Sequence, residues 1–334
     1  MAVLELDRLS RHFELTPGFV DRVIRRKEPS YIKAVERLSI AIGENEILGI
    51  AGESGCGKST TCTMVSGLLD PTDGDIRFKG NSILGLKGDA IKDYRRAVQM
   101  IFQDPYESLN PRFRIVDIVA EGPRALELWD ADEIVARSLS MLDAVGLPSE
   151  KYAERFPHEL SGGERQRVGI ASALVMEPEV IIADEPLSML DVSIRAGILD
   201  LLRDMQAARG FSSLYVSHDL SILGNVADRL LVMYLGQAME IGPAEEVIRN
   251  PKHPYTKALI GAVPVPDPRS RREIPNIRGE ISKPIDPPPG CRFAPRCPYA
   301  DASCGATFVE METGDSSLHQ AACHRLDAIA DEGT

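Results

Sequence analysis

The sequence lacks any long hydrophobic run. A helix that spans a bilayer needs about 20 consecutive apolar residues, whereas the densest apolar runs here, such as residues 47–51, have only the length of a strand. We therefore expect no membrane-spanning helix. The hydrophobic residues, 43% of the 334, are nevertheless enough to build a substantial core.

A secretory signal is also missing from the start of the chain. Residues 1–7 have neither the basic region nor the longer apolar block that such a signal requires. We therefore expect the protein to remain in the cytoplasm, a reducing compartment in which disulfides rarely persist.

An excess of basic residues is absent as well. Asp and Glu number 50 against 38 Lys and Arg, which gives a net charge of -12 and a pI near 5.1. Because proteins that bind nucleic acid normally present a basic face, this balance disfavours a general nucleic-acid binder. Internal repeats at solenoid periods are not visible either.

Up to about residue 240, short β-branched runs alternate with helix-length amphipathic stretches. The runs are residues 47–51, 180–183, 213–216 and 230–233. Such alternation predicts an α/β fold with a mainly parallel sheet. After Gly242 and Pro243 the sequence becomes rich in proline and then in cysteine, which predicts a domain boundary followed by a loop-rich C-terminal module.

A glycine-rich segment, residues 52–59, follows the first of these runs. It has two glycines separated by four residues and then Lys and Ser, which is the pattern of a phosphate-binding loop. Backbone N–H groups and a helix N-terminus attract phosphate in this arrangement. We expect Lys58 to contact the β- and γ-phosphates and Ser59 to bind magnesium. The other nucleotide-binding residues predicted here are Ser54, Gly55, Cys56, Gly57 and Thr60.

The run at residues 180–183 is followed directly by two carboxylates, Asp184 and Glu185. Ligands bind at the C-terminal end of the strands in open parallel sheets. We expect Asp184 to hold magnesium through water and Glu185 to polarise the attacking water. An acidic pair after a strand is equally common as a solvated strand end, and the phosphate loop favours the functional interpretation.

Residues 160–167, Leu-Ser-Gly-Gly-Glu-Arg-Gln-Arg, lie before this strand and resemble the signature of ABC ATPases. Glu164 stands where the commonest form of the signature has Gln. Ser161, Gly162 and Gly163 would open a helix whose N-terminus can point at an anion.

Other segments occur in the order of that family. Gln103 resembles the Q-loop glutamine, which senses magnesium and the γ-phosphate, and His218 resembles the switch histidine. Asp191 resembles the D-loop aspartate, with Met189 in place of the usual small residue. For stacking on adenine we favour Phe13, with Tyr31 and a plain core role as the alternatives. The resemblance covers about residues 3 to 245.

The resemblance implies a RecA-like P-loop NTPase core in residues 1–245, with a helical subdomain at about 88–165. It also implies that two ATPase subunits, copies or paralogues, bind ATP head to tail, so that the phosphate loop of one faces the signature of the other. The metal, Lys58 and a Ser161 acting in trans would stabilise charge while Glu185 orients water.

Residues 104–112 closely resemble a stretch of the ATPases of oligopeptide, dipeptide and nickel importers, where this surface receives the membrane permeases. Residues 253–259 and 290–298 resemble the C-terminal extension of that branch, which we place at 246–334. The resemblance implies import of a peptide or related solute through two permeases and, indirectly, an extracytoplasmic binding protein. It places the subunit on the cytoplasmic face of the inner membrane. A soluble ABC ATPase of translation or DNA repair, and an exporter ATPase, are the alternatives.

Four of the six cysteines fall within residues 291–334: Cys291, Cys297, Cys304 and Cys323. A bound metal would stabilise a segment poor in apolar residues. The intervening five, six and eighteen residues differ from the short spacing of structural zinc sites, and the Cys297-Pro298 step also occurs in ferredoxin-type ligation. Peptide-importer ATPases that resemble this chain are linked to such a cluster. We therefore expect a 4Fe-4S cluster, with zinc or four unrelated free thiols as the alternatives.

Overall fold

The computed structural model describes residues 2–16, 29–263, 277–279, 284–311 and 319–331. The chain divides into two compact units. The helical unit contains Ile42–Ile47 and Ile83–Val216, and the phosphate-loop unit contains Ala2–Ala41, Leu48–Ser82 and Ser217–Thr334.

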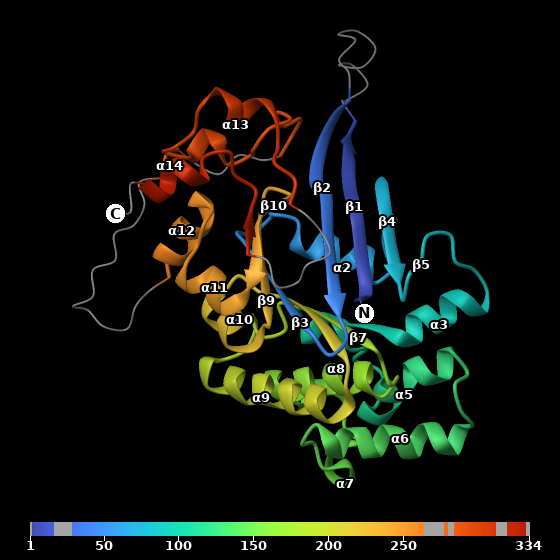
Figure 1. Cartoon of the computed structure of the whole chain (residues 1–334). Helices are drawn as coiled ribbons and strands as arrows, with labels where there is room; N and C mark the ends of the chain where they lie inside the picture. The colour runs from blue at the N-terminus through green and yellow to red at the C-terminus, as the bar shows by residue number, and fades with distance from the viewer. Residues whose placement is uncertain (1, 17–28, 264–276, 280–283, 312–318, 332–334) are drawn as a thin grey trace. The chain divides into compact units, whose positions relative to one another are not determined.

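The helical unit contains three parallel strands in the order β8-β7-β6, of which the central strand, β7, is labelled in Figure 1. They are β6 (Val98–Ile101), β7 (Val180–Asp184) and β8 (Ser212–Val216). Every residue of β7 and β8 is buried. Such near-continuous apolar runs are typical of parallel strands covered on both faces.

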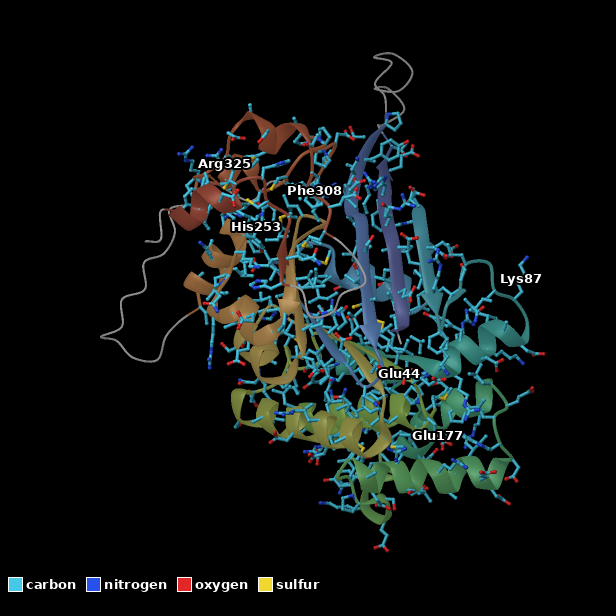
Figure 2. The ribbon with its side chains drawn as sticks, viewed as in Figure 1. Glu44, Lys87, Glu177, His253, Phe308 and Arg325 are labelled. Carbon is cyan, nitrogen blue, oxygen red and sulfur yellow. The ribbon has the colours of Figure 1, made fainter. Side chains whose placement is uncertain are left out.

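The helices of this unit are α3 (Asp89–Ala97), α4 (Pro105–Ser108), α5 (Ile115–Ala125), α6 (Ala131–Ala144), α7 (Ser149–Tyr152), α8 (Gly162–Leu174) and α9 (Val192–Arg209). Helices α5, α6 and α8 pack on one another, and α8 also contacts β6. Outside this core, Glu177, which is labelled in Figure 2, forms ion pairs with Arg96 and Arg137.

The phosphate-loop unit contains an antiparallel sheet in the order β2-β1-β4-β5. Its strands are β1 (Ala2–Leu15), β2 (Ser30–Gly43), β4 (Asp73–Phe78) and β5 (Asn81–Ser82). A second group of strands follows the order β11-β10-β9-β3. It comprises β3 (Ile47–Ala51), β9 (Arg229–Tyr234), β10 (Gln237–Pro243) and β11 (Gln320–Ala321), with β3 parallel to β9.

The helices of this unit are α2 (Lys58–Val65), α10 (Leu220–Val226), α11 (Ala244–Arg249), α12 (Pro254–Gly261), α13 (Ala302–Ala306) and α14 (Leu326–Asp331). His253 caps α12, and its Nδ1 accepts the backbone N–H of Tyr255 at 3.1 Å (Figure 2). Burial lowers the pKa of His253 to about 3, so the ring is neutral at physiological pH and carries its proton on Nε2.

Glu240 of β10 fastens the start of the C-terminal extension to this unit. Its fully buried carboxylate accepts the backbone N–H groups of Lys252 and His253, each at 2.8 Å. The same carboxylate lies 2.6 Å from Nε2 of His319. Because a buried carboxylate needs such partners, Glu240 fixes the path of the chain that enters α12.

The predicted α/β class is confirmed, and the four predicted strands appear as β3, β7, β8 and β9. The antiparallel sheet was not predicted, because its long strands β1 and β2 carry many half-exposed positions instead of an apolar run. Among the described residues, no helix combines the length and apolar character that a membrane crossing requires.

Candidate functional site

The phosphate loop joins β3 to α2 and lies against backbone on two sides. Gly52 has φ 154°, and a Cβ at this position would lie 2.3 Å from the carbonyl oxygen of Met233. Gly57 has φ 107°, and a Cβ there would lie 2.3 Å from the carbonyl oxygen of Ala34. Both positions therefore require glycine, as the loop pattern predicts.

Lys58, the first residue of α2, folds back over this loop. Its side chain is 5% exposed, and Nζ donates to the carbonyl oxygens of Gly52 at 2.7 Å and Glu53 at 3.1 Å. Neither carbonyl carries a negative charge to balance the buried ammonium, so the loop favours an anion. Burial raises the pKa of the neighbouring Cys56 thiol, which keeps that side chain neutral.

The remaining predicted nucleotide-binding residues belong to the same loop and to the first turn of α2. Ser54, Gly55 and Ser59 are exposed and Thr60 is half-buried. The first turn of α2 has no acidic residue, so the positive potential of the helix N-terminus is not locally cancelled.

Gln103 and Glu185, predicted to contact magnesium and the attacking water, lie close together in the helical unit. Nε2 of Gln103 donates to Oε2 of Glu185 at 3.4 Å. Glu185 follows β7 with φ 44°, a left-handed conformation that is costly for a residue other than glycine, and its N–H donates to the carbonyl of Val216 at 3.0 Å. Strain of this kind is concentrated at functional positions. Asp184, at the end of β7, is 6% exposed.

The signature begins α8, and Glu164 holds its first residue. The N–H and hydroxyl of Ser161 donate to Oε2 of Glu164 at 2.7 and 2.8 Å, and the hydroxyl of Tyr152 donates to Oε1 at 2.6 Å. The Tyr152 hydrogen bond, followed by those from Ser161, lowers the pKa of Glu164. Glu164 has two acceptor oxygens where Gln would have one. Ser161 donates to Oε2 and Tyr152 donates to Oε1.

Gly163 permits close packing at the same helix start. A Cβ there would lie 2.7 Å from Cγ2 of Ile194 on α9. Arg165, one turn into the helix, lies over the ring of Tyr106 at 4.1 Å from its centroid. The signature helix is therefore in direct contact with the 104–112 segment.

The other predicted residues occupy loop and strand positions. Asp191 lies at the N-cap of α9 and is exposed, and His218 follows β8 in the phosphate-loop unit and is exposed. Phe13 and Tyr31 are 36% and 40% exposed, so exposure does not choose between them. The guanidinium of Arg11 lies 4.7 Å from the Phe13 ring centroid, and the adenine role stays a prediction.

The metal predicted for Cys291, Cys297, Cys304 and Cys323 has no support in the described part of the chain. There, no group of three or more His, Cys, Asp or Glu is placed to hold a metal ion, and the four thiols are free. Burial raises the pKa of Cys291 to about 12, with a further increase from Cys297 and Cys323. Without a metal-holding group among the described residues, the structure gives no support to the 4Fe-4S expectation or to zinc.

Sequence and structure comparisons identify the family. A model described as ABC transporter matches residues 35–188, and one described as oligopeptide/dipeptide transporter, C-terminal region, matches residues 239–304. The oligopeptide transport ATP-binding protein OppF of Salmonella typhimurium is 43% identical over 98% of this chain and 97% of its own length. The chain belongs to the oligopeptide transport ATP-binding proteins. It is accordingly an ATP-hydrolysing subunit of the ABC importer type.

Further relatives agree with this assignment to the oligopeptide transport ATP-binding proteins. The putative oligopeptide transport ATP-binding protein YkfD of Bacillus subtilis is 40% identical over 97% of this chain and 95% of its own. A dimeric ATP-binding cassette solved with ADP and phosphate matches with a TM-score of 0.62 and 25% identity, covering 72% of this chain and 99% of that one. The structure of cbiO1 from Clostridium perfringens, part of the cbiONQ transporter complex, also has a TM-score of 0.62, with 29% identity over 75% of this chain and 91% of its own.

One contact of the phosphate loop was missed from the sequence. The Tyr255 hydroxyl accepts the backbone N–H of Glu53 at 3.1 Å across 202 residues. Tyr255 belongs to the His-Pro-Tyr-Thr stretch, within the residues matched by the C-terminal family model. The sequence resemblance assigns that stretch to the C-terminal extension, but its pattern carries no signal of the long-range contact.

The first prediction concerns Glu164. Because its pKa is lowered in the folded protein, its stabilising contribution is present above the unfolded pKa near 4.5 and is lost as pH falls through the folded pKa. Glu164→Gln should lower the free energy of unfolding at pH 7.5 by about 0.5–1 kcal/mol. Urea unfolding at pH 7.5 and at pH 4 should show this deficit shrinking in acid. Glu121→Gln, an exposed change on α5, is the control, and a Glu164→Gln deficit that is independent of pH would contradict the assignment.

Proposed function

We propose that this chain energises the uptake of oligopeptides or a chemically related solute by hydrolysing ATP. The observation that carries the proposal is the 43% identity to OppF over nearly the full length of both chains. The match to the oligopeptide/dipeptide C-terminal region, at residues 239–304, supports the same branch. A soluble ABC ATPase of translation or DNA repair, and an exporter ATPase, are not favoured by these relatives.

In this proposal the phosphate loop binds ATP through its backbone N–H groups, and Lys58 contacts the β- and γ-phosphates. Ser59, Gln103 and Asp184 would hold Mg²⁺, which supplies charge neutralisation on the phosphates. Glu185 orients the attacking water, and its 3.4 Å hydrogen bond from Gln103 supports that pairing of roles. His218 would contact the γ-phosphate, and Phe13 would stack on adenine.

The partners follow from the same assignment. Ser161, Gly162, Gly163 and Glu164 would contact ATP held by a second ATPase subunit, a copy or a paralogue, with Asp191 at that interface. Two membrane permeases would bind the subunit at the cytoplasmic face of the inner membrane, and a solute-binding protein would act through them. Together these partners form the transporter that ATP hydrolysis drives.

The permease-docking surface is proposed at residues 104–112. Large apolar side chains are exposed in and beside this segment, at Phe102, Tyr106 and Phe113. Exposed apolar groups that lie close in sequence are typical of protein contact sites. The Arg165–Tyr106 contact would connect such docking to the start of the signature helix.

The prediction for catalysis is that Glu185→Gln retains ATP binding but lowers turnover by about 100-fold or more, because water is no longer oriented by a carboxylate. Steady-state hydrolysis by the purified transporter measures turnover, and a fluorescent ATP analogue measures binding. Lys58→Ala is the matched control and should lose binding itself. Near-normal hydrolysis by Glu185→Gln would remove Glu185 from the mechanism.

The prediction for docking is that Arg112→Glu, or a bulky residue at Ser108, uncouples transport while nucleotide binding is retained. Solute uptake and ATP binding should be measured on the same preparations. Arg203→Glu, an equivalent charge reversal at an exposed position of α9, should transport normally. If Arg112→Glu also transports normally, the docking surface lies elsewhere.

The 4Fe-4S cluster at Cys291, Cys297, Cys304 and Cys323 stays a hypothesis that rests on the spacing of these cysteines in the sequence. Anaerobically purified protein should then absorb broadly near 400 nm, and Cys297→Ser should abolish that absorption. Protein that is colourless and metal-free, or colourless with stoichiometric zinc, would refute the cluster.

A further inference from the structure

The C-terminal extension places a charged side chain against the phosphate loop. Residues 291–297 form a short loop that contains the 3-10 turn Ala294–Arg296. Nη1 of Arg296 lies 3.4 Å from Oε2 of Glu53 and 3.2 Å from the hydroxyl of Tyr234. Because the Arg296 side chain is only 13% exposed, this ion pair is better shielded from solvent than an ordinary surface pair.

Tyr255 of the same extension holds the backbone of Glu53. Its hydroxyl accepts the Glu53 N–H at 3.1 Å, and the residue is 1% exposed. The ring is fixed by Tyr234, with centroids 4.6 Å apart, and by Phe293 at 5.4 Å. Without the Tyr255 hydroxyl the Glu53 N–H would lose this partner, and a buried donor without a partner is costly. The hydrogen bond therefore constrains where Glu53 can lie.

Glu53 joins these contacts to the phosphate-binding ammonium. Its N–H is held by Tyr255 and its carboxylate by Arg296, while its carbonyl accepts from Nζ of Lys58 at 3.1 Å. One residue therefore separates the extension from Lys58. A shift of Tyr255 or Arg296 would move Glu53, and Glu53 is hydrogen-bonded to the Lys58 ammonium.

Arg292 fastens the other end of the 291–297 loop. Its side chain is 2% exposed and lies 3.0 Å from Oε2 of Glu36 on β2, with Nη1 donating to the carbonyl of Lys33 at 2.8 Å. Its backbone N–H donates to Oε1 of Gln237 at 3.0 Å. These anchors fix the loop against strands of the same unit.

The turn between β9 and β10 carries a second connection to the phosphate loop. The N–H of Gly236 donates to the carbonyl of Cys56 at 2.8 Å, and its carbonyl accepts the N–H of Glu36 at 2.9 Å. Arg292 donates to the carbonyl of Leu235 in that turn. The 291–297 loop thus supports the phosphate loop at Glu53 directly and at Cys56 through the turn.

We propose that Tyr255 and Arg296 are positioning residues that hold the phosphate loop in its nucleotide-binding geometry, so that the C-terminal extension helps to set the affinity for ATP. The proposal rests on the assignment of residues 52–59 as the ATP site. Neither residue needs to touch the nucleotide, because both act through Glu53. Loss of either contact weakens binding of ATP in the ground state and the transition state alike.

The test uses the full-length chain, a fluorescent ATP analogue for Kd and steady-state hydrolysis by the assembled transporter. Tyr255→Phe keeps the ring and removes only the hydroxyl, and Arg296→Gln removes the ion pair with Glu53 together with the contact to the Tyr234 hydroxyl. Each should raise Kd and KM about fivefold, the size expected for one lost hydrogen bond or shielded ion pair, with kcat changed less than twofold. Arg296→Lys should recover most of the affinity because it keeps the charge.

A double-mutant cycle tests the route through Glu53. Combining Glu53→Gln with Arg296→Gln should weaken binding no more than either single change. Additive effects would show that Arg296 acts independently of Glu53 and would overturn the proposal. Arg325→Gln removes the ion pair with Asp301, 3.0 Å long, inside the same extension, and should leave Kd unchanged.

Two results separate the failure of this proposal from the failure of the ATP-site assignment. If Lys58→Ala abolishes binding while Tyr255→Phe and Arg296→Gln, shown to be folded by their unchanged Tm, bind normally, only the positioning roles are wrong. If Lys58→Ala binds normally, the ATP-site assignment is wrong and this inference is overturned with it.

Discussion

The structure around the proposed nucleotide site depends on one constraint, the close approach of backbone to the phosphate loop. Carbonyl oxygens of Met233 and Ala34 lie where side chains at Gly52 and Gly57 would otherwise project. A loop confined in this way has few alternative conformations, so its N–H groups are arranged before a phosphate arrives. Lys58, held by the carbonyls of Gly52 and Glu53, adds a buried positive charge to that arrangement. Preorganised charge and dipoles are what phosphoryl transfer mainly requires of a protein.

Preorganisation also explains two features of this chain, Glu164 in place of the usual Gln of the signature and the contacts of the C-terminal extension. Glu164 gives the signature helix a capping carboxylate with partners on both oxygens, which fixes Ser161 more firmly than one amide oxygen would. The C-terminal extension reaches the phosphate loop through Tyr255 and Arg296. In each case a glutamate of a proposed nucleotide-binding motif is held by side chains outside that motif. Tyr152 holds Glu164, and Tyr255 and Arg296 hold Glu53.

Much of this arrangement could be predicted from the sequence because it is local. The informative patterns are short-range: the glycine spacing, the apolar run before residues 52–59 and the acidic pair after residues 180–183. Strands β3 and β7 lie where those patterns predict them. The Glu53–Tyr255 and Glu36–Arg292 contacts join residues more than 200 positions apart, and no periodicity records such pairs. The cysteine spacing suggested a metal, yet among the described residues no group of three or more His, Cys, Asp or Glu is placed to hold one, because spacing along the chain does not determine how close side chains lie in the fold.

We propose that ATP hydrolysis at this site drives solute import. The most direct measurement is the accumulation of a labelled oligopeptide inside vesicles that contain the purified transporter, with binding protein supplied on the opposite side. We predict accumulation against a gradient only when MgATP is present on the side of this subunit, and hydrolysis that rises when peptide and binding protein are added. Steady hydrolysis without any accumulation, unchanged by the permeases or by a panel of peptides, would show that hydrolysis at this site does not drive import.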